Sequence, residues 1–218
     1  MPLKIAFNLV GISHLIHNNR WPISRSYLDC CENTLQLRDM LTRYRDIEGN
    51  PADIDIHLTT YMSSESAQIV ATYNPKSHQF LQFEGSHQVD TFIASLESLK
   101  KYTYDLVVVS RFDSLFDIGE LSELCIFKYA FNFLCKEKDH WDNYRFVNDC
   151  FYIFPFSMLD DVIAAARELR ANPPRPGLMD MHGLYTPLVK RIGEDNVRFM
   201  TADDYLSSGN VFYKLIRR

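Results

Sequence analysis

An apolar, strand-like run of this sequence ends abruptly in two opposite charges. Residues 105–113 read DLVVVSRFD, so three valines lead into Ser110, Arg111 and Asp113. A carboxylate in such a position can bind a hard divalent cation, Mg²⁺ or Mn²⁺, which takes oxygen ligands and often a substrate phosphate as well. A surface ion pair would explain the same charges without a ligand, but the direct step from valines to charge favours a site.

Further along the chain, two carboxylates and a histidine could move protons or hold a metal ion. Asp149 precedes the apolar run CFYIF, while Asp180 and His182 follow the proline-rich break at 172–177. A positioned carboxylate can act as a general base, and a histidine can ligate a metal. Simpler interpretations are an Asx turn at Asn148 and Asp149, and a helix N-cap at Asp180.

Alternating strands and helices must position these residues. Residues 3–12 predict a strand buried on both faces, residues 24–46 an amphipathic helix, and residues 53–61 a second strand. Strand, helix and strand in this order predict a parallel α/β unit, in which ligands bind outside the carboxyl ends of the strands. We therefore expect one cleft to gather Asn8, Leu9, Val10, Gly11, Thr59, Thr60, Tyr61, Ser110, Arg111 and Asp113.

The remaining pattern extends the same architecture. It predicts helices at about 64–73, 89–102, 157–171 and 180–191, strands at 78–83, 126–134, 146–154 and 196–200, and an irregular tail. The fold class is α/β, with one domain built on a mixed, mostly parallel sheet flanked by helices.

Composition excludes several classes of protein. The formal net charge is −5, with no block of five like charges, which argues against a basic nucleic-acid-binding surface. No apolar run approaches 18 residues, so we expect no membrane span. Neither a dinucleotide-binding glycine fingerprint nor a P-loop occurs. Five cysteines without a CxxC pair, and no signal-like N-terminus, lead us to expect reduced thiols and a cytoplasmic location.

Five segments taken in order, KIAFNLVG, DIDIHLTTY, YDLVVVSRFDSLF, VNDCFYIFP and MDMHGLYTPL, resemble the nucleotide-sugar glycosyltransferases of the GT-A fold. The nearest likeness is to the N-terminal domain of the chlorovirus capsid glycosyltransferases, and it covers nearly the whole chain. It implies hexosyl or deoxyhexosyl transfer from a nucleotide-diphosphate sugar, with a UDP-sugar favoured, to a glycan or glycoprotein hydroxyl. For a viral protein, it also implies the host cytoplasm.

The resemblance also implies roles for individual residues. Asp113 matches the metal-binding acid of the DxD motif, whereas Arg111 stands where the first acid would be; His182 matches a late histidine that ligates Mn²⁺ or Mg²⁺ in some relatives. The first two strand ends would hold the nucleoside, with Ser110 and Arg111 beside them. Asp149 and Asp180 are both candidates for the base of an inverting enzyme, while a retaining enzyme would need no such base.

The implied division of the chain is a donor-binding half at about 1–117 and an acceptor and catalytic half at about 118–218, in one domain that could belong to a longer polypeptide. Two alternatives remain. Arg111 in place of the first acid is compatible with a module that binds a nucleotide sugar without catalysis. A sugar nucleotidyltransferase would also use acids and Mg²⁺ at strand ends, although a glycine-rich phosphate loop is absent.

Overall fold

A seven-stranded sheet forms the centre of the computed structural model. The structure describes residues 2–11, 28–43, 49–82, 87–112, 114–122, 124, 126–174, 181–201 and 213–215. The strand order is β3-β2-β1-β4-β7-β6-β8. The strands span Lys4–Gly11 (β1), Asp53–Tyr61 (β2), Ser77–Leu81 (β3), Leu106–Arg111 (β4), Phe131–Phe133 (β6), Phe151–Pro155 (β7) and Val197–Phe199 (β8).

The sheet is mixed because of β7. Strands β1 to β4 pair in parallel, and so do β6 and β8, whereas β7 runs antiparallel to both of its neighbours, β4 and β6. The amino end of β7 therefore meets the carboxyl ends of β4 and β6. A separate pair of strands, β5 (Ser114–Phe116) and β9 (Tyr213–Leu215), is antiparallel.

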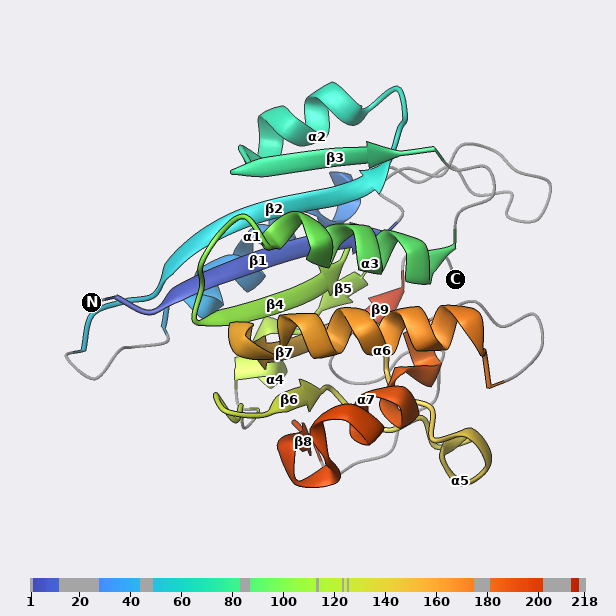
Figure 1. The fold of residues 1–218 in the computed structure, drawn as a ribbon. Helices are drawn as coiled ribbons and strands as arrows, with labels where there is room; N and C mark the ends of the chain where they lie inside the picture. The colour runs from blue at the N-terminus through green and yellow to red at the C-terminus, as the bar shows by residue number, and fades with distance from the viewer. Residues whose placement is uncertain are drawn as a thin grey trace.

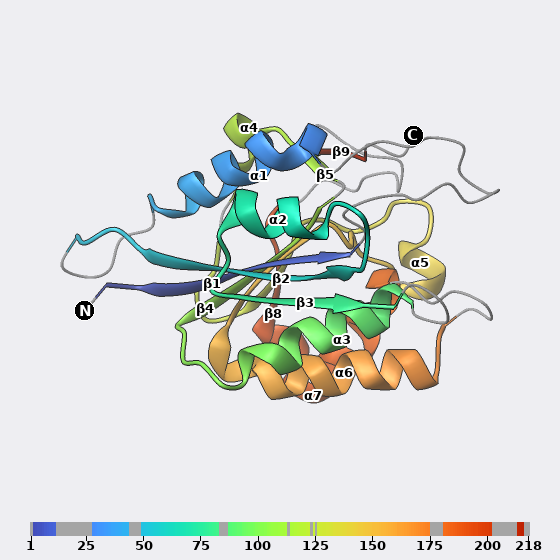
Figure 2. The ribbon, with the colours of Figure 1, turned by 90° about the horizontal axis from the view of Figure 1, so that it is seen from above.

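Helices cover both faces of the sheet (Figures 1 and 2). On one face lie α1 (Leu28–Leu41), α2 (Ser66–Tyr73) and α4 (Ile118–Ser122); on the other lie α3 (Gln88–Leu99), α6 (Leu159–Ala171) and α7 (Tyr185–Ile192). The short helix α5 (Trp141–Tyr144) follows β6. Short 3₁₀ turns cover Phe156–Met158, Met181–Leu184 and Glu194–Asn196. Within the described ranges, no helix is long and apolar enough to cross a membrane.

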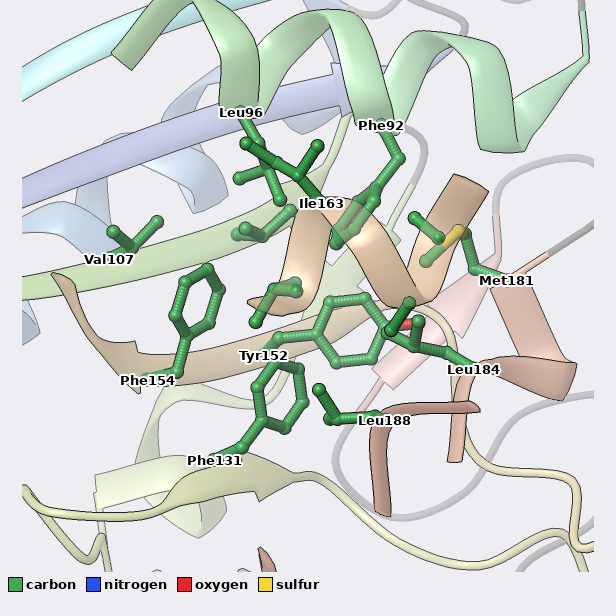
Figure 3. Packing of buried hydrophobic residues seen from close by; sticks show 14 of the residues in the cluster. Phe92, Leu96, Val107, Phe131, Tyr152, Phe154, Ile163, Met181, Leu184 and Leu188 are labelled. Carbon is green, nitrogen blue, oxygen red and sulfur yellow. The ribbon is translucent and has the colours of Figure 1, made fainter. Parts of the chain in front are cut away.

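The uniformly apolar strands are explained by two cores, one on each side of the sheet. Successive side chains point to opposite faces, so Val108 of β4 packs toward α1 while Val107 packs toward α3 and α6. In the second core, Phe131, Tyr152 and Phe154 of β6 and β7 lie beneath Phe92 of α3 and Ile163 of α6 (Figure 3). Strand β1 likewise contributes Phe7 to one core and Ala6 to the other, which confirms the prediction of a strand buried on both faces at residues 3–12.

Several predicted elements differ from the structure, among them the helix predicted at 180–191, whose first turn is a 3₁₀ turn before α7 begins at Tyr185. Strand 126–134 shrinks to β6 because the Asn132 side chain holds a turn, accepting from the Phe127 N–H and donating to the carbonyls of Phe127 and Ala130. Strand 146–154 begins only at Phe151, after an Asx turn in which Asn148 Oδ1 accepts the Cys150 N–H at 3.0 Å. The tail is not wholly irregular, since β9 pairs with β5.

Candidate functional site

The predicted strand ends lie side by side. In the register of the sheet, Val10 of β1 stands opposite Thr59 of β2 on one side and opposite Arg111 of β4 on the other. Gly11, with φ of +98°, ends β1 in a left-handed conformation that favours glycine. Parallel pairing thus brings the three strand ends to one edge of the sheet, as the sequence predicts.

Most side chains expected at the nucleoside are buried in this edge. Asn8 and Leu9 are fully buried, and Asn8 Nδ2 donates to Ser95 Oγ of α3 at 2.9 Å. The Tyr61 hydroxyl accepts from Thr91 Oγ1 at 2.6 Å. Val10, Thr59, Thr60 and Ser110 are also buried, whereas Gly11 is half-buried.

Arg111 forms a buried ion pair with Asp149. Its Nη1 donates to Asp149 Oδ2 at 2.6 Å, and Gln88 Nε2 at the start of α3 donates to the same oxygen at 2.6 Å. Asp149 is only 5% exposed. The antiparallel pairing of β7 with β4 makes the contact, because Ser110 stands opposite Phe151 and the Arg111 N–H donates to the Cys150 carbonyl.

His182 lies between two carboxylates. Its Nδ1 is 2.8 Å from Glu137 Oε1 and 3.0 Å from the Val147 carbonyl oxygen, while its Nε2 is 3.6 Å from Asp149 Oδ2. The Val147 carbonyl oxygen can only accept a hydrogen bond, so Nδ1 carries a proton. Glu137 is buried, and the Val147 N–H donates to the His182 carbonyl, which fixes the ring's position.

The electrostatics of this cluster keep Asp149 ionised. Burial raises the pKa of Asp149, but the Arg111 guanidinium, His182 and the Gln88 hydrogen bond together outweigh burial and hold the pKa well below the usual range. A carboxylate stabilised in this way is a weak proton acceptor. Its environment suits a fixed anion that orients Arg111.

Two predicted residues, Asp113 and Asp180, lie outside the described residues. Among the described residues, no group of three or more His, Cys, Asp or Glu side chains could hold a metal ion. His182 nevertheless has the environment of a metal ligand. Metal-ligating histidines usually donate their other ring N–H to a carboxylate or carbonyl, and here Nδ1 donates to the Val147 carbonyl.

Sequence reasoning missed Gln88 and Glu137. Gln88 begins a helix whose pattern only marks its apolar face. Glu137 belongs to the polar segment KEKDHWDNYR, which predicts a solvated loop, yet its side chain is 4% exposed. Neither position shows a local signal in the sequence, because the partner of each side chain lies more than 40 residues away. Glu137 pairs with His182, and Gln88 with Asp149.

Comparison of the fold places the chain in a known structural class. The structure matches β-1,4-galactosyltransferase 7 from Drosophila, solved with manganese, UDP-Gal and xylobiose, with a TM-score of 0.50 at 9% identity, over 99% of this chain and 71% of that one. This likeness and the mixed sheet define a GT-A fold. No protein-family profile and no curated protein sequence matches the chain.

Two further solved structures match with lower TM-scores. A nucleoside-diphosphate-sugar pyrophosphorylase from Vibrio cholerae matches with a TM-score of 0.49 at 15% identity, over 89% of this chain and 90% of that one. The glycosyltransferase GlyE from Streptococcus pneumoniae matches with a TM-score of 0.47 at 11% identity, over 92% of this chain but only 46% of that one. The chain thus spans about half the length of GlyE.

Proposed function

We propose that this chain is a glycosyltransferase that moves a hexosyl or deoxyhexosyl group from a nucleotide-diphosphate sugar, with a UDP-sugar favoured, to a hydroxyl of a glycan or glycoprotein. The observation that carries the proposal is the ion-paired cluster of Arg111, Asp149 and His182 at the carboxyl edge of the GT-A sheet. Ligands of open α/β sheets bind at this edge. The Drosophila enzyme, which shares the fold, was solved with UDP-Gal.

Arg111 is proposed to bind the donor diphosphate. A guanidinium matches phosphate oxygens in geometry and charge. Asp149 binds Arg111 and is itself held by the Gln88 side chain of α3, so the cation is positioned before the donor binds. Ser110, Gly11 and the end of β2 at Thr59, Thr60 and Tyr61 would border the nucleoside.

Asp180 is our candidate for the base. The acceptor oxygen attacks the anomeric carbon, the bond from that carbon to the diphosphate oxygen breaks, and the acceptor proton passes to a carboxylate. Asp149 suits this step poorly, because its charge is already stabilised by Arg111. We therefore assign positioning to Asp149 and proton transfer to Asp180, in an inverting reaction.

A divalent cation, Mn²⁺ or Mg²⁺, is part of the proposal, with Asp113 and His182 as its ligands. Such a cation, when bound, neutralises charge on a departing diphosphate. Glu137 and Val147 hold His182 at Nδ1 and thereby orient its Nε2 toward Asp149.

The donor is tested first, by thermal unfolding with UDP-, GDP-, ADP- and dTDP-sugars, each with and without Mn²⁺. A ligand at 100 times its dissociation constant stabilises a protein by about 2.7 kcal/mol. We expect UDP-sugars to raise the unfolding temperature, and Mn²⁺ to increase that rise. Asp113→Asn should remove the part of the rise that depends on Mn²⁺. Asp195→Asn, at an exposed acid, is the matched control. No shift with any donor would refute the proposal.

Transfer is tested next with the donor that binds. Asp180→Asn should lower the transfer rate by at least about 100-fold, the usual weight of a general base, with the donor shift retained. Donor binding by the wild-type chain with neither transfer nor hydrolysis would favour the non-catalytic binding module. Turnover of a nucleoside triphosphate with a sugar phosphate would favour a nucleotidyltransferase.

On the sequence resemblance to the chlorovirus capsid enzymes alone, we extend this proposal to the host cytoplasm, and to a donor-binding half at about 1–117 and an acceptor half at about 118–218. Fractionation of cells that express the tagged chain tests the location. Limited proteolysis with and without the bound donor tests whether protection is concentrated in the first half.

A further inference from the structure

Residues 136–147 leave the sheet between β6 and β7 and return to it, and we call this segment the excursion. Its two legs are joined at the base, where Lys136 bridges Val147 and the Glu137 N–H donates to the Phe146 carbonyl at 3.0 Å. Helix α5 forms its outer part and ends at Arg145, whose φ is +55°. In Figure 1, α5 lies at the end of the molecule toward which the arrows of β2 and β3 point.

Both legs of the excursion hold His182. Glu137 on the first leg contacts Nδ1, and Val147 on the second leg exchanges contacts with the ring and the main chain of His182. The position of α5 is thus tied directly to the proposed site.

A row of aromatic rings runs from His182 to the surface. The His182 and Phe146 rings are 6.4 Å apart, and the Tyr144 ring stacks on Phe146 at 5.1 Å with an interplanar angle of 27°. Phe146 is 3% exposed, whereas Tyr144 is 36% exposed. Tyr144 therefore has one face against a buried ring, meets the His140 ring edge to face at 6.2 Å, and keeps the exposed remainder of its side chain in solvent.

Helix α5 is held on its other side by cation–π contacts. Lys136 Nζ lies 4.8 Å and the Arg145 guanidinium 5.0 Å from the centre of the Trp141 ring. Trp141 also meets Tyr185 of α7 edge to face. These contacts fix the helix that carries Tyr144, so little freedom is lost when a ligand packs on the ring.

We propose that a sugar ring of the acceptor packs on the Tyr144 ring, which we call the platform. This inference rests on the proposed function and specifies that the acceptor is a carbohydrate. Pyranose rings present C–H groups on one face and hydroxyls at the rim. A rigid aromatic face meets the C–H groups and leaves the hydroxyls in water.

The test uses the methyl β-glycosides of glucose, galactose, xylose and mannose as probes, in saturation-transfer NMR with the nucleotide that gives the largest thermal shift. We expect the protons of one sugar face to receive saturation. Tyr144→Ala should weaken binding by up to about tenfold, the weight of one aromatic contact, and Tyr144→Phe should bind like the wild type.

Tyr129→Ala is the matched control, because Tyr129 is 89% exposed and precedes β6 at the opposite edge of the sheet. Equal binding by Tyr144→Ala and wild type, equal losses in the two alanine variants, or no binding of any glycoside by the wild type would each overturn the inference. The rise in unfolding temperature that the nucleotide causes in the wild-type chain is measured separately. Failure of the proposed function is therefore distinguished from failure of Tyr144 to bind the sugar. An unchanged unfolding temperature of Tyr144→Ala verifies that the variant is folded.

Discussion

Two buried polar clusters, one toward each end of the sheet, are each centred on a histidine and differ in what surrounds it. At the carboxyl edge, His182 lies between the carboxylates of Glu137 and Asp149. Toward the amino ends of the parallel strands, His57 of β2 lies between two hydroxyls, with Nδ1 at 2.6 Å from Ser77 Oγ and Nε2 at 2.7 Å from the Tyr104 hydroxyl.

The hydrogen bonds around His57 can be assigned without ambiguity. Tyr104 donates its one hydroxyl proton to Asp55 Oδ2 at 2.9 Å, so the hydroxyl must accept from His57 Nε2–H. In a neutral ring Nδ1 then accepts from the Ser77 hydroxyl. Lys76 pairs with Asp55 at the outer end of the chain of bonds. The network is complete without a charge on His57.

The difference shows where this fold keeps buried charge. Burial lowers the pKa of His57 to about 4, and although Asp55 opposes that effect, Lys76 and Lys101 add to it. At the carboxyl ends of the strands, Arg111 and Asp149 both stay charged although burial removes their hydration. Their close pairing offsets this desolvation cost. A network whose buried histidine is neutral, and whose one ion pair, Lys76–Asp55, lies at its solvent-exposed end, suits a structural role; we call it the neutral cluster after its histidine. The buried ion pair at the strand ends instead suits a binding site.

The largest effect should follow from breaking the charged cluster. Arg111→Met leaves Asp149 buried without its cation, and we expect a loss of about 3–5 kcal/mol in the free energy of unfolding. Urea denaturation at pH 7.5 measures it. The double variant Arg111→Met/Asp149→Leu should recover most of that loss while donor binding stays absent. A loss below about 1 kcal/mol in the single variant would contradict a buried ion pair.

The neutral cluster should respond to pH instead. The pKa of His57 in the folded chain is about 4, below the value of about 6.5 in an unfolded chain. Between these values the unfolded chain binds a proton that the folded chain does not, so stability falls as the pH drops from 6.5 toward 4, by about 3 kcal/mol in all.

Urea denaturation between pH 7.5 and pH 4 measures this slope. In His57→Asn the slope should flatten, because the titrating group is gone. His78→Asn, at an exposed histidine of β3, should keep it. Identical slopes in the wild type and His57→Asn would show that His57 is not the group concerned.

The smallest effect should come from removing one hydroxyl of the neutral cluster. Tyr104→Phe keeps the ring but takes a donor from Asp55 and leaves His57 Nε2–H without its acceptor, for a loss of about 2 kcal/mol. Tyr102→Phe is the matched control, since Tyr102 meets the His57 ring through its own ring at 5.0 Å. Equal effects in the two variants would mean that the hydroxyl bonds contribute nothing specific.

Much of the fold follows from local pattern. The valines of β4 and the apolar run of β1 predict strands buried on both faces, and both lie between two helical layers. Parallel pairing of these strands also places Arg111 beside the end of β1, whose other neighbour is the end of β2, so the three strand ends lie together as predicted. These inferences succeed because the spacing of apolar residues along a strand indicates whether one or both of its faces are buried.

Tertiary structure alone decided the composition of the charged cluster. Asp149 meets Arg111 because β7 runs antiparallel to β4, and Glu137 meets His182 because the excursion returns to the sheet at Val147. A charged residue in a polar segment has the same local pattern whether it ends in water or in a buried pair. Its place depends on long-range strand pairing and on partners that offset its desolvation, and neither is encoded in the residues around it.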